Sequence, residues 1–234
     1  MKKKIYLSYD QDRRLLLHFF RKVIVLKTKA KSKPFIYNGK LIDLFEHEYN
    51  CYYKNVRMTE RAVELALTKE WLKDKTEVIE VGAVTSYYWP NLIKDIVDPA
   101  DNHPLVNYKC SLFDKDFTDR NVLSISTIEH VGTFEHDLQL VEDCVEALIK
   151  LIKESKNCLI TFPVGYNKKL DEYIKSGQYK DMELKNNEKL EVTVFDRGII
   201  DNIFKQVPFE KWPKLKYSRY TGARAVAIID KKTI

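Results

Sequence analysis

Long apolar runs, glycine-rich loops and paired cysteines are all missing from this 234-residue chain. The apolar stretch at 15–26 contains Arg21 and Lys22 and is far shorter than the roughly 20 apolar residues that a membrane span needs. The basic start at Met1 to Lys4 is followed by charged residues, so it does not form a secretory signal. We therefore expect a cytoplasmic protein without a membrane span.

Cysteine is scarce, and its spacing is not that of a metal site or a disulfide framework. The pattern indicates free thiols in a reducing compartment. The nearby pairs Glu129-His130 and Glu135-His136 have no fixed ligand register, so we expect no metal. The four cysteines are Cys51, Cys110, Cys144 and Cys158.

The formal net charge of +6 favours anionic partners in a general way. The basic residues are dispersed, however, and do not gather with aromatic residues into a stripe. The sequence therefore does not indicate nucleic acid as a substrate. Internal repeats and low-complexity tracts are also missing, and the oligomeric state, including a homodimer, stays open.

The first 56 residues are predicted to be an N-terminal extension or lid that precedes a main domain at 57–234. A strand at Lys4–Leu7, a helix around Gln11–Val25 and a short helix at Leu41–Glu48 are expected there. Thr59 then opens a helix to about Leu72, because apolar residues recur at helical spacing after it.

From Lys75 onward, short apolar runs alternate with helical segments, among them an amphipathic helix at Leu138 to Lys153. This alternation predicts an α/β fold with a doubly wound, mostly parallel sheet. The tail is expected to close the sheet with an antiparallel edge hairpin made by the last two of the predicted strands. The strands are expected at Glu77–Val81, Ile96–Val97, Asn121–Ser126, Cys158–Phe162, Glu191–Phe195 and Ala223–Ile229.

Ligands of such sheets bind beyond the carboxyl ends of the strands. The first strand is followed by Gly82, and a glycine lets the backbone approach a ligand closely. Asp98 follows the second strand, eighteen residues after Glu80, where its carboxylate can accept hydrogen bonds from both hydroxyls of a ribose. Residues 110–114 could flank an adenine ring.

The stretch from Glu77 to Gly165 resembles the core of the class I S-adenosylmethionine-dependent methyltransferases. The order and spacing of the motifs carry the match, and 57–67 (RMTERAVELAL) resembles a helix before the core of some bacterial members. The resemblance implies a Rossmann-like methyltransferase fold. The motifs are VIEVGAV at 78–84, IVDP at 96–99, STIEHVG at 126–132 and LITFPVG at 159–165.

The resemblance implies S-adenosyl-L-methionine as the cofactor. Gly82 would lie against its methionine moiety, and Glu80 would fix the loop and the amino group of the donor. Asp98 would hold the ribose. The other implied cofactor-binding residues are Ala83 and Val84 in the first loop, Pro99 beside Asp98, Ser111 and Leu112 at the adenine, and Ser126 and Thr127 under the sulfonium.

The same resemblance implies O-methyl transfer to a small-molecule acceptor, hydroxyl-bearing or anionic, of surface-polysaccharide biosynthesis. His130 is the leading candidate for the catalytic base, because its unperturbed pKa lies near neutrality, and Glu129 is second. The guanidinium group of an arginine can donate two parallel hydrogen bonds to an anionic acceptor. The candidate acceptor-binding residues are Tyr87, Tyr88, Arg219 and Arg224.

Val84 and Ser86 stand where the family usually has further glycines, and Pro90 interrupts the short link from Val81 to Asp95. This departure favours an alternative, a catalytically inactive methyltransferase-like module for binding or assembly. A nicotinamide-dependent oxidoreductase would need GxGxxG, and residues 82–87 lack two of the three glycines.

Overall fold

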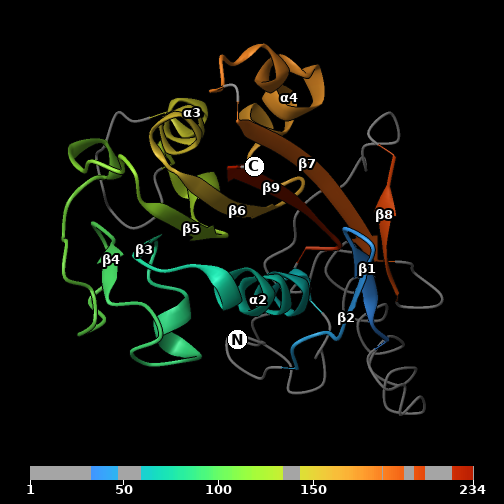
Figure 1. Cartoon of the computed structure of the whole chain (residues 1–234), viewed down its shortest axis with the longest axis horizontal. Coiled ribbons are helices and arrows are strands. Elements are labelled where there is room, and N and C mark those ends of the chain that lie inside the picture. Colours follow the sequence, from blue (N-terminus) through green and yellow to red (C-terminus); the bar gives the residue numbers. More distant parts are fainter. Residues whose placement is uncertain are drawn as a thin grey trace, which may run out of the picture.

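The computed structural model describes residues 33–46, 59–133, 143–185, 187–197, 203–208 and 223–233. They form a seven-stranded sheet in the order β4-β3-β5-β6-β9-β7-β8, with a separate hairpin β1-β2 beside its β8 end (Figure 1). The strand expected at Lys4–Leu7 and the helix expected at Gln11–Val25 lie outside the described residues.

The elements of the described chain are short, and most of the predicted strands are found within a few residues of their expected bounds. The strands are β1 (Phe35–Tyr37), β2 (Lys40–Ile42), β3 (Val78–Val81), β4 (Asp95–Val97), β5 (Asn121–Ile125), β6 (Asn157–Pro163), β7 (Glu188–Arg197), β8 (Phe204–Val207) and β9 (Ala225–Thr233). The α-helices are α2 (Glu60–Trp71), α3 (Cys144–Glu154) and α4 (Lys168–Ser176).

The prediction of a doubly wound, mostly parallel Rossmann-like sheet is wrong. The sheet is mixed, because β4, β3, β5 and β6 pair in parallel whereas β9 pairs antiparallel with both β6 and β7, and β8 antiparallel with β7. The β3–β4 link holds only the 3₁₀ turn η2 (Thr85–Tyr87) in place of a crossover helix, and Pro90 lies in the same link. A proline has no N–H for a helical hydrogen bond, so it disfavours a longer helix there.

The prediction that the last two strands form an antiparallel hairpin at the edge of the sheet is also wrong, because they do not lie at the edge. β9 lies inside the sheet between β6 and β7, and the unpredicted strand β8 forms the edge. The run from Ala225 to Lys231 is buried on both faces, as a central strand requires. The apolar run predicted the strand, but it does not say which neighbours the strand pairs with.

The helix expected at Leu41–Glu48 is wrong as well. Asn38 and Gly39 adopt φ angles of 48° and 74° and form a tight turn, so Lys40–Ile42 pairs with Phe35–Tyr37 as a hairpin. Asn-Gly is a strong hairpin signal, because both residues tolerate the left-handed conformation of this turn. The described part of the predicted N-terminal helical extension is therefore a β-hairpin.

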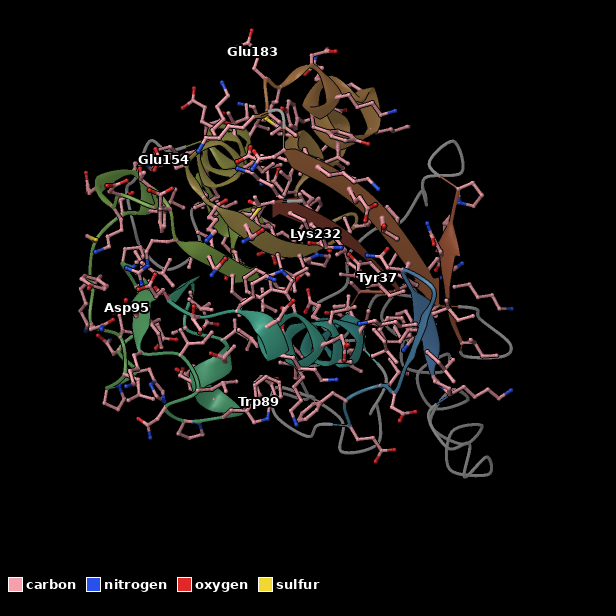
Figure 2. All side chains as sticks on the ribbon, in the orientation of Figure 1. Tyr37, Trp89, Asp95, Glu154, Glu183 and Lys232 are labelled. Carbon is pink, nitrogen blue, oxygen red and sulfur yellow. The ribbon has the colours of Figure 1, made fainter. Side chains whose placement is uncertain are left out.

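Helices cover both faces of the sheet (Figure 1). α3 and α4 pack on one face, and α2 packs with the β1-β2 hairpin on the other, so that two separate apolar clusters form. The hairpin belongs to the main core, because the Phe35 ring meets the Phe195 ring edge-on at a centroid distance of 5.3 Å. Tyr37 and Lys232, labelled in Figure 2, both contact the carboxylate of Asp230.

α2 and α3 confirm the two amphipathic helices predicted in the main domain, although residues 138–142 of the second lie outside the described chain. Asp143 begins α3, and its carboxylate accepts hydrogen bonds from the N–H groups of Val145 and Glu146. Among the helices of the described ranges, not one combines the length and the apolar character needed to cross a membrane.

A fully buried lysine ties β9 to the end of α3. The Nζ atom of Lys231 donates hydrogen bonds to the carbonyl oxygens of Ile152 and Ser155, at 2.8 Å and 2.6 Å, and lies 3.0 Å from Glu188 Oε1. These carbonyls belong to the last turn of α3, whose final C=O groups have no partner within the helix. The ammonium therefore caps the helix from inside the core.

We expect Lys231→Met to lower the free energy of unfolding by about 2–5 kcal/mol, because it leaves a buried carboxylate and two helix-end carbonyls without their cation. Urea denaturation measures this loss. Lys189→Met is the matched control, since Lys189 is 60% exposed and its ion pair with Glu191 should contribute little. Equal effects of the two substitutions would contradict the capping role.

Candidate functional site

The loops that follow β3, β4 and β5 meet at the carboxyl edge of the parallel strands. The amide of Ala83 donates to Asp98 Oδ2 at 3.2 Å, which joins the loop after β3 to the loop after β4. Thr127, after β5, packs against Gly82. The structure thus brings together the residues that the sequence placed at neighbouring strand ends.

The side chain of Glu80 fixes the conformation of the loop that follows β3. Its buried carboxylate accepts hydrogen bonds from the amide of Thr85, at 2.8 Å, and from the Thr85 hydroxyl. The Ser86 hydroxyl donates to the carbonyl of Ala83 at 2.7 Å. Burial raises the pKa of Glu80 to about 7, although the hydrogen bonds from Thr85 oppose that shift. Side-chain hydrogen bonds therefore close this loop.

Gly82 faces a protein side chain. Its φ angle is +89°, and a Cβ atom built on it would lie 2.0 Å from Thr127 Oγ1 and 2.7 Å from Thr127 Cγ2. The glycine is thus required for the approach of Thr127, where the sequence led us to expect a ligand. The Thr127 hydroxyl donates to the carbonyl of Ile125 at 3.0 Å, which fixes its position.

Asp98 is held by three backbone amides. Its Oδ1 accepts from the N–H groups of Ala100 and Asp101, each at 2.8 Å, and its Oδ2 accepts from Ala83. The side chain is partly exposed, and Oδ2 accepts one of the two hydrogen bonds that a carboxylate oxygen can take. The carboxylate is therefore fixed in place and retains accepting capacity. Pro99, beside it, is exposed.

The predicted adenine border is a short turn. The Ser111 hydroxyl accepts a hydrogen bond from the amide of Phe113 at 3.0 Å, at the start of η3 (Leu112–Asp114). Leu112 is 5% exposed and belongs to the core cluster under α3. Its side chain therefore packs inside the protein, so any ligand contact there falls to the turn backbone and Ser111.

A second group of polar side chains lies where α2 meets the ends of β5 and β6. We call Glu60, Glu64 and Glu129 the acidic cluster, with Arg61 among them. Glu64 Oε1 accepts hydrogen bonds from the hydroxyls of Ser126, at 2.6 Å, and Thr161, at 2.8 Å. The sequence did not indicate a functional role for Glu60, Arg61 or Glu64, since charged residues on a helix usually face solvent.

The backbone of Ser126 supports a functional role for this position. Its φ angle is 42°, in the left-handed region, which costs a residue with a Cβ atom about 1–2 kcal/mol. Such conformations concentrate at functional sites, where the surrounding structure holds them. Ser126 connects the two groups, because its hydroxyl meets Glu64 and the next residue, Thr127, packs on Gly82.

The two candidate bases stand next to each other on η4 (Ile128–His130). Glu129 is 1% exposed, and burial raises its pKa well above the ordinary value, with a further contribution from Glu64. His130 Nε2 lies 3.7 Å from Glu129 Oε1, and its Nδ1 forms a 2.9 Å hydrogen bond with the Tyr166 hydroxyl. Tyr166 was not singled out in the sequence, although it directly follows the LITFPVG motif at 159–165.

Arg61 is the positive charge that the surrounding carboxyl groups share. Its Nη1 lies 3.5 Å from Glu64 Oε2, and its guanidinium interacts electrostatically with Glu60, Glu129 and Tyr88. It also interacts with Glu80 under the first loop. Tyr88, predicted to contact the acceptor, is thus near the acidic cluster.

The remaining predicted acceptor residues are engaged elsewhere or not described. The Tyr87 hydroxyl donates to Asp101 at 2.9 Å. Arg224 donates from Nε and Nη2 to the two carboxylate oxygens of Asp196, at 2.7 Å and 2.8 Å, so its fork is occupied by a protein carboxylate. Arg219 lies outside the described residues.

A hollow of about 630 Å³ lies at the opposite edge of the sheet, near the amino ends of β3 and β4. Arg120 on its wall is paired with Asp95, labelled in Figure 2, and its Nε donates to the Glu77 carbonyl. No group of three His, Cys, Asp or Glu side chains in the described ranges could hold a metal ion. Cys144 and Cys158 are buried free thiols.

The chain matches no protein-family model, no curated protein and no solved structure.

We expect Gly82→Ala to lower the free energy of unfolding by about 2–4 kcal/mol, from left-handed strain together with the clash against Thr127. Gly39→Ala is the matched control, because its φ is +74° but no atom lies within 4 Å of an added Cβ. It should cost only the strain. The double variant Gly82→Ala/Thr127→Gly should recover part of the loss in urea denaturation, and no recovery would contradict the packing role.

Stability should fall as the pH rises from about 5 to 8, because the folded chain keeps protons on buried carboxyl groups that the unfolded chain has released. The ordinary pKa of 4.5 is raised to about 7 for both Glu60 and Glu80, by burial first and, at Glu60, by Glu64. Melting temperatures across this range test the slope. Glu80→Gln should reduce it. Glu70→Gln should leave it unchanged, since hydrogen bonds from Lys73 and Lys40 lower the pKa of Glu70.

Proposed function

We propose that this chain is an S-adenosylmethionine-dependent methyltransferase that acts on a small molecule. The observation that carries the proposal is the hydrogen bond between the Ala83 amide and Asp98, which brings the glycine loop and a fixed carboxylate to one place. This juxtaposition suits an adenosyl group at the ends of parallel strands, with Asp98 Oδ2 accepting from a ribose hydroxyl.

The electrostatics of the site suit the positive sulfonium of the donor. The acidic cluster contains the buried carboxyl groups of Glu64 and Glu129 and the half-buried one of Glu60, with a single guanidinium among them, and Glu64 contacts Ser126. Methyl transfer from a sulfonium is a direct displacement, so the protein mainly aligns acceptor, methyl carbon and sulfur and excludes water. The burial of the groups around Glu64 supports such exclusion.

Glu129 and His130 support proton removal from the acceptor. Glu129 is buried, and burial raises its pKa well above the ordinary value, as is common for groups that exchange protons at functional sites. His130 is oriented by Tyr166 and lies beside Glu129. Transfer to oxygen and a link to surface polysaccharides remain predictions. The guanidinium of Arg224 is already paired with the carboxylate of Asp196, so Arg224 does not support an anionic acceptor.

Calorimetric titration with S-adenosylhomocysteine tests the donor site. We expect saturable binding that Asp98→Asn weakens by about tenfold or more, because hydrogen bonds to a charged acceptor contribute about 1.5–3 kcal/mol. Asp95→Asn, at the amino end of the same strand, is the matched control and should bind normally. Equal affinity of the wild type and Asp98→Asn would remove Asp98 from the site.

A second candidate function is a catalytically inactive module that binds or assembles. The packing of Thr127 into the space beside Gly82 favours it, because a protein side chain occupies a position expected for a ligand. Absence of both heat and thermal shift with S-adenosylhomocysteine would favour this alternative over the methyltransferase.

A further inference from the structure

The acidic cluster holds several buried polar atoms without hydrogen-bond partners in the described part of the chain. Glu60 Oε2, Glu64 Oε2, Glu129 Oε2 and Arg61 Nη1 are all buried in this way. Buried polar atoms in native proteins nearly always have partners, so a group of orphans at one place calls for an explanation such as a ligand. Three of the four orphans are carboxylate oxygens.

The cluster, when its carboxyl groups are ionised, carries more negative than positive charge. Three carboxyl groups surround one guanidinium, and the Arg61–Glu64 contact, at 3.5 Å, uses that guanidinium. Glu64 and Glu129 are 0% and 1% exposed, so water does not compensate them. Burial raises the pKa of Glu60 and Glu129, which favours their protonated forms, and a bound cation would stabilise the charged forms instead.

The chemistry of the orphaned atoms favours an ammonium group. An ammonium carries three N–H donors and no acceptor. Glu60 Oε2 and Glu129 Oε2 have no hydrogen-bond donor in the described residues, and Glu64 Oε2 has only the 3.5 Å ion pair with Arg61 Nη1. A divalent metal needs several oxygens that converge at about 2.0–2.6 Å, and no set of three such side chains in the described residues is placed to hold one.

We propose that the acidic cluster binds the protonated amino group of a small molecule, and that this amine is the methyl acceptor, so that the methyl group is transferred to nitrogen in place of the oxygen that the sequence resemblance implies. The assignment of the amine as acceptor rests on the proposed function. Position supports it, because the Ser126 hydroxyl contacts Glu64 and the next residue, Thr127, packs on the glycine loop. The amine would therefore lie beside the donor loop.

Glu129 accepts a proton from the bound ammonium, which exposes the nitrogen lone pair. The lone pair attacks the methyl carbon of the donor, and the carbon–sulfur bond breaks with its electron pair on sulfur. The products are a methylated ammonium and neutral S-adenosylhomocysteine, and the proton on Glu129 passes to solvent.

Thermal unfolding in phosphate buffer tests the amine site, with matched pairs of probes that differ in the amino group. Putrescine is compared with 1,4-butanediol, and glucosamine with glucose. At least one amine should raise the melting temperature by several degrees, because ligands that bind only the folded state stabilise it, whereas its neutral partner should not. That amine should also stimulate the formation of S-adenosylhomocysteine from the donor.

Glu129→Gln and Glu64→Gln should abolish the shift with the amine. Asp230→Asn is the matched control, because Asp230 is a buried carboxyl group whose partners are Tyr37 and Lys232. It should keep the shift.

The outcomes separate the two proposals. Binding of S-adenosylhomocysteine without any amine effect overturns the amine site and leaves the proposed function standing. Amine binding without S-adenosylhomocysteine binding overturns the proposed function alone. Equal shifts with the amine and its neutral partner overturn the amine site. A shift with Mg²⁺, Mn²⁺ or Zn²⁺ that Glu129→Gln removes, with no amine effect, identifies a metal site in its place.

Discussion

The buried carboxylate of Glu64 is the constraint on which the carboxyl edge depends. It lies on the apolar face of α2 between buried Val63 and Leu65, where an unpaired charge would be costly. The hydroxyls of Ser126 and Thr161 donate to it and so fix α2 against the ends of β5 and β6. Because Ser126 is held, Thr127 is held against Gly82, and this contact in turn fixes the loop after β3.

The burial of Glu64 also explains why the acidic cluster lowers the stability of the folded chain. The carboxylate of Glu64 has two hydroxyl donors and a 3.5 Å contact with the guanidinium of Arg61. The neighbouring Glu60 and Glu129 interact electrostatically with the same guanidinium. Natural proteins retain such groups chiefly where function needs them, at a cost in stability. The raised pKa of Glu129 and the left-handed backbone of Ser126 are two signs of that cost at one edge.

Local patterns predicted the elements better than their arrangement. The apolar runs indicated β3, β5 and β6, and helical spacing indicated α2, because burial of one face leaves a direct mark on the sequence. Pairing leaves no such mark, so the central place of β9 was missed. At the site, the order of the strands predicted that the loop after Glu80 and Asp98 lie close together, and they meet through the Ala83 amide. Glu64 was missed, because its partner Thr161 lies 97 residues away.

The missing second glycine of the first loop has a physical explanation that differs from loss of function. Val84, which stands near that place, has φ and ψ angles of −75° and −48°, a right-handed conformation that a β-branched residue adopts without strain. Only Gly82 in this loop has a positive φ. The bond between Glu80 and Thr85 then shapes the turn that further glycines would shape elsewhere. The departure in sequence therefore indicates a different loop, and the case for an inactive module depends on Thr127 alone.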